Sequence, residues 1–358
     1  MKRIVVCCDG TWNNPRKPKQ TNVSKLRDAI LQRHAADGTA AQLVRYVSGV
    51  GSSGSLWDRL RGVAIGYGLD TNVQAAYQHI ARDYRPGDDI YLFGFSRGAY
   101  TARSTLGMVR KCGIVKDTSD SAVRRAWEHY RNDIHPEDDV AKDWRRENAL
   151  IVSGPGDYVP IAKFIGVWDT VGSLGVPIKR LRQQFNFHDV TLTSLVDNAF
   201  HALAIDERRK DYEPTLWARS KTPRKDQQLE QRWFGGAHSD VGGGAAREGQ
   251  DAQSDYCLEW MLGKAVETGL EVDRSRIAWN RVQPGEFPKL HLDPGILFRI
   301  VEWLRGSLLR PIGKGVPEGK EGHGRPSFET VDDEARRRLT DDPAYRPTNL
   351  MVWELEQV

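Results

Sequence analysis

The sequence has few cysteines and lacks a long apolar run. Its four cysteines do not have the spacing of metal ligands, and Cys7 and Cys8 fall in an apolar segment where thiols act as small apolar side chains. A disulfide scaffold is therefore not expected. The first apolar run, Ile4 to Cys8, is too short for the apolar part of a signal peptide or for a membrane span. We expect a cytoplasmic protein, or one exported without a cleaved signal peptide.

A large excess of charge of one sign is also absent. The 52 basic residues nearly balance the 48 acidic ones, so composition gives no support to a nucleic-acid partner. A hydrophobic content of 39% and 34 glycines are typical of a globular protein with many tight turns, which excludes a largely disordered chain. Because we find no internal repeat and no clear boundary, residues 1–358 are expected to form a single domain.

The strongest local pattern is an apolar run that ends in a turn built from glycine and serine. Residues 90–95 are apolar or aromatic, the turn reads Gly94-x-Ser96-x-Gly98, and apolar residues recur at helical spacing after it. This order of strand, sharp turn and helix is typical of a nucleophile elbow, in which side chains at the glycines would collide with neighbouring elements. The pattern predicts an exposed nucleophile at Ser96. The backbone N–H of Arg97, at the start of the helix, would then face an oxyanion.

Other apolar strands alternate with helical tracts along the chain. This alternation predicts an α/β fold with a mainly parallel central sheet flanked by helices. His201 lies in one expected helix, and we interpret it as a buried core histidine. We expect strands at 4–8, 42–47, 162–168 and 229–234, and helices beginning at Ser24 and Asp70 and spanning 192–205 and 254–268.

Two regions fall outside this alternation. The charged region 117–150 contains two helical tracts and is expected to be an insertion, either a solvated hairpin or a cap that covers the substrate. Residues 270–358 are expected to form a C-terminal helical extension in which the Gly/Pro/Lys-rich segment 311–326 is mobile. The amphipathic tract 296–309, with Arg310 on another face, would pack on the protein body or lie at a membrane interface.

Polar clusters follow four of the expected strands. They are Asp9-Gly10-Thr11, Ser96, Asp169 and His238, and the carboxyl ends of parallel strands share one edge of a sheet. The order Ser, Asp, His is that of an α/β-hydrolase catalytic triad. Ser96 would attack an acyl carbon, His238 would carry the proton, and Asp169 would orient the imidazole. Gly10 or Thr11 would provide the oxyanion hole with a second donor beside Arg97.

Alternatives exist for two of these assignments. Asp240 or Asp206 are candidates for the acid in place of Asp169, which could instead be a turn residue. His238, Asp240 and Asp9 could form a metal site of mixed nitrogen and oxygen ligands, which would suit metal-assisted hydrolysis. The metal site would leave the elbow unexplained, so we favour the triad.

Four motifs stand in order along the chain: Asp9-Gly10-Thr11-Trp12-Asn13, residues 94–103 around Ser96, Trp168-Asp169-Thr170-Val171-Gly172, and Gly236-Ala237-His238-Ser239-Asp240-Val241-Gly242-Gly243-Gly244. Together they resemble a bacterial and fungal family of α/β hydrolases that includes the first class of type VI secretion lipase effectors, which are phospholipases. The resemblance extends from Met1 to about Gly269, and Arg325-Pro326-Ser327-Phe328 is similar to the family's terminal motif.

This resemblance implies an α/β-hydrolase fold, a serine nucleophile, an acyl-ester substrate and no organic cofactor. A phospholipid substrate and peripheral membrane contact follow for a lipase of this type. The chain is more compact than the secreted lipases, so an intracellular esterase acting on soluble or glycan esters is an alternative. A non-catalytic binding module that kept the fold is a further one. The sequence does not fix the oligomeric state.

Overall fold

The computed structural model describes residues 1–10, 20–32, 42–49, 64–152, 157–171, 191–221, 223–244, 251–292, 306–316 and 323–357. These residues contain a seven-stranded sheet in the order β2-β1-β3-β4-β5-β6-β7, and every neighbouring pair of strands is parallel. The predicted α/β-hydrolase fold class is thereby confirmed. The strands are β1 (Arg3–Cys8), β2 (Gln42–Val47), β3 (Asp89–Phe95), β4 (Ala162–Trp168), β5 (Val196–Ala204), β6 (Gln228–Phe234) and β7 (Glu329–Val331).

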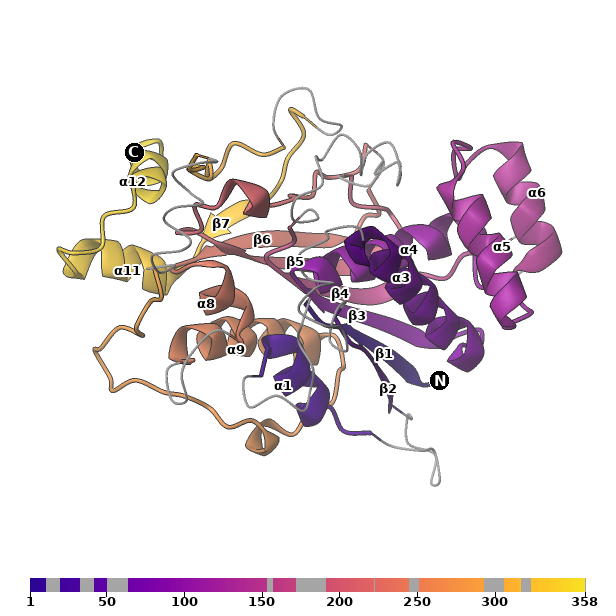
Figure 1. Ribbon diagram of the computed structural model, residues 1–358, viewed down its shortest axis with the longest axis horizontal. Coiled ribbons are helices and arrows are strands. Elements are labelled where there is room, and N and C mark those ends of the chain that lie inside the picture. The colour runs from indigo at the N-terminus through magenta and orange to yellow at the C-terminus, as the bar shows by residue number, and fades with distance from the viewer. Residues whose placement is uncertain are drawn as a thin grey trace.

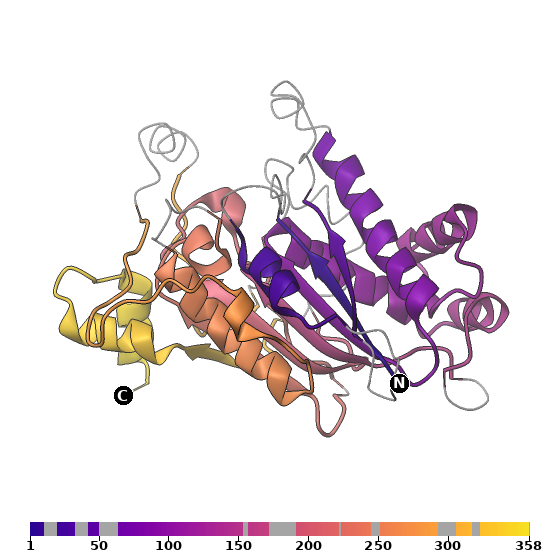
Figure 2. The same cartoon turned by 90° about the horizontal axis from the view of Figure 1, so that it is seen from below.

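Helices cover both faces of the sheet. Side chains alternate along β1, so that Ile4 and Val6 belong to one apolar core and Val5 and Cys7 to the other. The first core lies under α3 (Ala64–Asp83) and α4 (Arg97–Cys112), and the second lies under α1 (Asn22–Ala29) and α9 (Ala252–Glu267) (Figures 1 and 2). Because both faces are buried, central strands are almost entirely apolar.

The charged insertion forms a helical hairpin, as expected. It consists of α5 (Asp120–Arg131) and α6 (Asp139–Asn148), which pack on the outer side of α3 and α4 (Figure 1). Arg145 of α6 donates a hydrogen bond to the carbonyl oxygen of Lys111, near the C-terminal end of α4. Ser96 precedes the opposite end of α4, so the hairpin is anchored at the end remote from Ser96. This position favours the solvated hairpin over the substrate cap.

Three elements differ from the sequence prediction, one in type and two in where they begin. Residues 192–205, expected to be helical, contain strand β5, whose apolar residues also recur at helical spacing. Helix α3 begins at Ala64, so Asp70 lies inside it and does not cap it. Helix α1 is capped by Thr21, whose side chain accepts a hydrogen bond from the backbone N–H of Ser24.

The C-terminal region is not only helical. It contributes edge strand β7 to the sheet, followed by α11 (Asp333–Asp341) and α12 (Thr348–Leu355) beside it (Figure 1). Of the segment expected to be mobile, 311–316 and 323–326 are described, and Ile312 and Val316 are buried in a third apolar cluster. Of the amphipathic tract 296–309, residues 296–305 lie outside the described residues. No helix in the described ranges has the length and apolar character needed to cross a membrane.

Candidate active site

Ser96 stands on a strained turn between β3 and α4. Its backbone has φ 57° and ψ −120°, a conformation that non-glycine residues rarely adopt. A Cβ at Gly94 would lie 2.6 Å from the Cα of Ala99, and one at Gly98 would lie 2.6 Å from the carbonyl oxygen of Asp9. Both glycines are therefore required by close backbone packing, as the sequence predicts. The turn has the backbone strain and tight packing of a nucleophile elbow.

Ser96 and Asp169 follow neighbouring positions on adjacent parallel strands. Phe95 of β3 is paired with Trp168 of β4, and the backbone N–H of Ser96 donates to the carbonyl oxygen of Trp168 at 3.0 Å. Asp169 also has a positive φ, of 37°, and is completely buried. The register of β3 and β4 thus brings the serine and the carboxylate to the same edge of the sheet.

His238 reaches this edge from the end of β6. It begins the short helix α8 (His238–Gly242), and its Nδ1 lies 2.6 Å from Oδ2 of Asp169. The imidazole packs against Phe95, with ring centroids 4.6 Å apart, and against Tyr212 at 4.8 Å. Because Phe95 directly precedes Ser96, the ring is held close to the elbow. Among the described residues, the imidazole of His238 is hydrogen-bonded to Asp169 and not to Ser96.

Arg310 is a site residue that the sequence analysis missed. Its guanidinium is buried and contacts both carboxylate oxygens of Asp169, with Nη1–Oδ1 at 2.7 Å and Nη2–Oδ2 at 3.0 Å. The backbone N–H of Ala204 donates to the same carboxylate at 3.2 Å. Burial alone would raise the pKa of Asp169, but Arg310 and His238 hold the pKa of that carboxyl well below its usual range. Asp169 is therefore ionised at neutral pH.

From the sequence, Arg310 is expected on a face of the amphipathic tract away from the apolar residues, with the tract packed on the protein body or at a membrane interface. The structure buries the Arg310 side chain completely, which agrees with packing on the protein body and not with a membrane contact at this residue. No motif connects Arg310 to Asp169, which lies 141 residues earlier in the chain. Its only signal in the sequence is its place between an apolar stretch and Pro311.

Two of the three residues expected to donate to the oxyanion, Gly10 and Arg97, are among the described residues. Arg97 begins α4, with its side chain buried, and burial lowers the pKa of its guanidinium to about 10. The backbone N–H of Gly10 donates to the carboxylate of its neighbour Asp9 at 2.7 Å, so in this conformation it is directed at that side chain. Thr11 lies outside the described residues.

Asp9 organises the end of β1. Its Oδ2 accepts hydrogen bonds from the hydroxyls of Tyr46, at 2.6 Å, and Thr21, at 2.8 Å. Burial raises the pKa of Asp9, although these hydrogen bonds lower it in part. The side chain therefore links β1 to β2 and to the start of α1.

The two alternative acids face other partners. Asp240 accepts hydrogen bonds from the backbone N–H of Ala237 and from His291, whose Nδ1 lies 2.6 Å from Oδ1. Asp206 accepts from the backbone N–H of Gly236 and the hydroxyl of Tyr345. Neither carboxylate has a described hydrogen bond with the His238 side chain, whereas Asp169 does.

The alternative metal site is not assembled by this geometry. Asp9 is directed at Tyr46 and Thr21, Asp240 at His291, and His238 at Asp169. Across the described ranges, no group of three His, Cys, Asp or Glu residues is arranged to hold a metal ion.

His201 is a core residue, as the sequence predicts, but it belongs to β5 rather than to a helix. Its Nε2 accepts a hydrogen bond from the backbone N–H of Thr170 at 3.1 Å, and its Nδ1 contacts Gln231. Burial lowers the pKa of this imidazole to about 3. His201 therefore stays neutral and supports the loop that follows Asp169.

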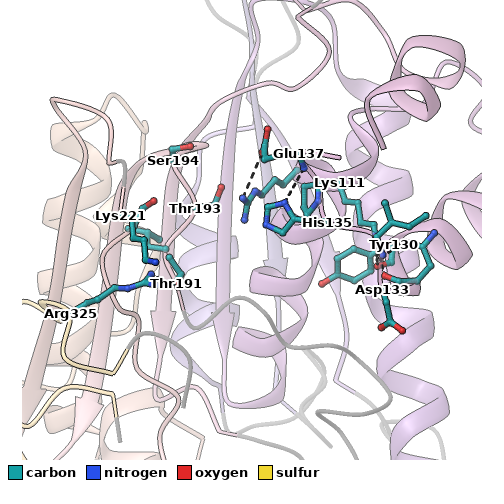
Figure 3. Close-up of a pocket in the computed structure, with 16 residues that line it drawn as sticks. Lys111, Tyr130, Asp133, His135, Glu137, Thr191, Thr193, Ser194, Lys221 and Arg325 are labelled. Atoms are coloured by element: carbon teal, nitrogen blue, oxygen red, sulfur yellow. Dashed lines mark hydrogen bonds and ion pairs between the residues drawn. The ribbon is translucent and has the colours of Figure 1, made fainter. Parts of the chain in front are cut away.

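A cavity of about 730 Å³ lies between the helical hairpin and the segment that enters β5 (Figure 3). Three of its basic side chains have local partners. Arg110 lies 3.7 Å from Glu137, Lys111 donates to the backbone carbonyl of Asn132, and Arg325 donates to the hydroxyl of Thr191. Arg110 and Lys111 are at the end of α4 opposite to Ser96. The cavity is thus separate from the Asp169–His238 pair.

The chain is similar to several known proteins. It is 28% identical over 229 residues to the uncharacterized protein YEL023C of Saccharomyces cerevisiae, a match that covers 58% of this chain and 31% of that protein. The chain therefore spans less than a third of this curated relative's length.

Two solved structures are similar at lower identity. One is a Tle1 effector bound to the VgrG spike of the type VI secretion system, with a TM-score of 0.46, 17% identity, and coverage of 76% of this chain and 74% of that chain. The other is an uncharacterized protein from Pseudomonas aeruginosa, with a TM-score of 0.44, 16% identity, and coverage of 79% and 48%.

A family model matches most of the chain. It describes the catalytic domain of Tle1-like phospholipase effectors of type VI secretion and matches residues 2–264. The matched region contains the elbow, Asp169 and His238, and it ends before Arg310. The chain belongs to the family of Tle1-like phospholipase effectors of type VI secretion, and residues 2–264 correspond to the catalytic domain of that family.

Proposed function

We propose that this chain is a serine hydrolase that cleaves carboxylic esters through Ser96, His238 and Asp169. The observation that carries the proposal is the 2.6 Å contact between Nδ1 of His238 and Asp169, at the strand edge that also holds Ser96. A carboxylate on Nδ1 fixes the tautomer that leaves Nε2 available to accept the serine proton. The strained backbone of Ser96 adds support, since such strain is common at nucleophiles.

The proposed reaction has two halves. Ser96 Oγ attacks the ester carbonyl carbon while His238 Nε2 takes its proton, and the leaving alcohol departs with that proton when the tetrahedral intermediate collapses. Water then attacks the acyl-enzyme, His238 takes a proton from it, and Ser96 regains the proton as the carboxylic acid leaves. Asp169 stays ionised throughout and stabilises the imidazolium. The reaction requires no organic cofactor and no metal.

The proposed oxyanion hole has two backbone donors. The N–H of Arg97 follows the nucleophile and begins α4, so the positive end of the helix adds to it. Thr11 would supply the second N–H, from the loop after β1, because Gly10 is already bonded to Asp9.

Family membership favours a phospholipid as the substrate and export by the type VI route. Phospholipids present their ester bonds at a membrane surface, so the enzyme would bind that surface peripherally. A soluble or glycan ester is the competing substrate class. Equal turnover of dispersed monomeric esters and of phospholipid vesicles would argue against the lipase assignment.

The direct test is covalent labelling of Ser96 by a fluorophosphonate, which traps an activated serine. Ser96→Ala should abolish labelling and hydrolysis of a short p-nitrophenyl ester. His238→Ala should lower kcat by about three orders of magnitude or more. Ser121→Ala, at an exposed position in α5, is the matched control and should behave as the unmodified protein. Full labelling and activity in Ser96→Ala would refute the proposed function.

A further inference from the structure

Arg310 connects the C-terminal region to the proposed catalytic acid. Besides Asp169, its guanidinium donates hydrogen bonds to the backbone carbonyls of Ala204, at 2.9 Å, and Tyr212. Its own carbonyl oxygen accepts a hydrogen bond from Asn349 of α12. The side chain is therefore held from several directions, and it lies beyond residues 2–264, where the family match ends.

We propose that Arg310 is a positioning residue of the reaction, which orients Asp169 toward His238 and balances its charge. This inference rests on the proposed function. The planar guanidinium contacts both carboxylate oxygens, so it fixes the plane of the carboxylate as a single point charge would not. His238 binds one of the same two oxygens, Oδ2, so the direction of its ring depends on that plane.

The charge balance has a defined effect on the proton that His238 carries. A buried carboxylate without a counter-ion would hold a proton on the Asp169–His238 pair more tightly. With Arg310 in place, the net charge near the imidazole is less negative, and the pair releases that proton at lower pH. Arg310 therefore weakens the hold of the Asp169–His238 pair on that proton.

Other charged groups near His238 are accounted for. Glu207 accepts a hydrogen bond from the backbone N–H of His238 at 3.3 Å, and Arg209 pairs with Glu207. Tyr212 packs against the ring, and Asp240 is bonded to His291. Glu207 thus has its own cation, and among the described residues Asp169, paired with Arg310, is the carboxylate bonded directly to the imidazole.

A purely structural role would give a different result from a positioning role. A buried ion pair is weak support for stability, because desolvation offsets most of its Coulomb energy, whereas removal of one partner is strongly destabilising. Loss of stability alone therefore does not test the proposal. The acid limb of the pH profile does, because it reports the protonation of the catalytic base.

The experiment measures kcat and KM of the full chain for a short p-nitrophenyl ester between about pH 5 and 9. In Arg310→Met the acid limb of kcat/KM should move up by about one pH unit. Plateau kcat should fall about 10- to 100-fold with little change in KM. Arg310→Lys keeps the charge without the two-pronged contact. It should keep the acid limb near its original pH while kcat still falls several-fold.

Three further variants separate the possible outcomes. Arg338→Met removes another buried arginine, paired with Glu334 at 2.9 Å, and should lower the melting temperature without moving the acid limb. In the Asp169→Asn background, Arg310→Met should cause no further loss of plateau kcat, because the carboxylate that Arg310 orients is absent. Ser96→Ala tests the proposed function by itself.

An acid limb that stays in place in both Arg310 variants, while Ser96→Ala is inactive, would overturn the role of Arg310 and leave the proposed function standing. A further loss of plateau kcat in the Asp169→Asn background would overturn it too, because Arg310 would then act without Asp169. If Arg310→Met does not fold, a kcat in Arg310→Lys equal to that of the unmodified protein would contradict the orienting role.

Discussion

Gly98 lies against the backbone of Cys8, and a Cβ at Gly98 would be 2.6 Å from the carbonyl carbon of Cys8. This contact joins the first turn of α4 to the end of β1. It places the elbow beside Cys8 and Asp9, which directly precede the two candidates for the second oxyanion donor in the sequence.

Gly98→Ala should therefore be strongly destabilising. Neither the strand carbonyl nor the helix can move without disturbing the sheet, so we expect a loss of about 2–3 kcal/mol in the free energy of unfolding and a large loss of activity. Gly263→Ala in α9 is the matched control, because nothing lies within 4 Å of its added Cβ. It should raise stability by about 0.5–1 kcal/mol. Urea unfolding of both variants checks the prediction, which fails if Gly98→Ala unfolds at the original urea concentration.

Asp169→Asn should lower kcat by about three to four orders of magnitude, because the amide can no longer fix the imidazole tautomer or stabilise its charge. It should also lower the melting temperature, since Arg310 loses its buried partner. Asp206→Asn and Asp240→Asn test the two alternative acids and should both be milder. A greater loss of kcat in folded Asp240→Asn than in folded Asp169→Asn would reassign the acid to Asp240.

Asp206 predicts a pH dependence of stability. Burial raises the pKa of this carboxyl to about 6, although hydrogen bonds from Gly236 and Tyr345 lower it in part. The folded state then binds more protons than the unfolded state between about pH 4 and 6, so this group's contribution to stability decreases as pH rises through that range. The difference is at most about 3 kcal/mol, since the carboxylate is partly exposed and keeps some hydration.

Asp206→Asn removes this cost, because the amide oxygen can accept the same two hydrogen bonds without a charge. The variant should melt at a higher temperature than the unmodified protein near pH 8 and at the same temperature near pH 4. Thermal unfolding at both pH values checks this. Equal melting temperatures at pH 8 would show that the ionised carboxylate costs nothing there.

A chelator should not change hydrolysis by the purified protein, because the proposed chemistry uses only side chains and water. The measurement is kcat with EDTA, followed by addition of a divalent ion. Activity that is lost with EDTA and restored by the ion would make Asp9, His238 and Asp240 metal ligands. In that case their arrangement must differ from the one described.

The elbow and most strands were predictable because their signals are local. Gly94, Ser96 and Gly98 lie within five residues, and the apolar run before them marks the strand. Strand β5 was misread because both of its faces are buried, so its apolar residues do not alternate, and Val196, Ala199, Phe200 and Leu203 match a helical period equally well.

The rest of the site depends on contacts between distant parts of the chain. Arg310 pairs with Asp169 only because the C-terminal segment returns to the sheet edge, and no spacing rule describes that return. Strand β7 is only three residues long, and two of them are polar, so the sequence there has no apolar run that would predict a strand. The sequence could not decide between Asp169 and Asp240 as the acid, because Asp240 is only two residues from His238. In the structure the Asp169 carboxylate is bonded to His238, whereas the Asp240 carboxylate is bonded to His291.

All four cysteines are free and buried, and burial raises the pKa of each thiol. A thiol of this kind presents no thiolate to an oxidant or to a thiol reagent. The folded protein should therefore be equally stable at reducing and at oxidising potentials. Because Cys8 and Cys112 lie in one core and Cys7 and Cys257 in the other, a reagent reaches all four only when both cores open. The rate at which all four thiols are modified thus measures how fast both faces of the sheet unfold.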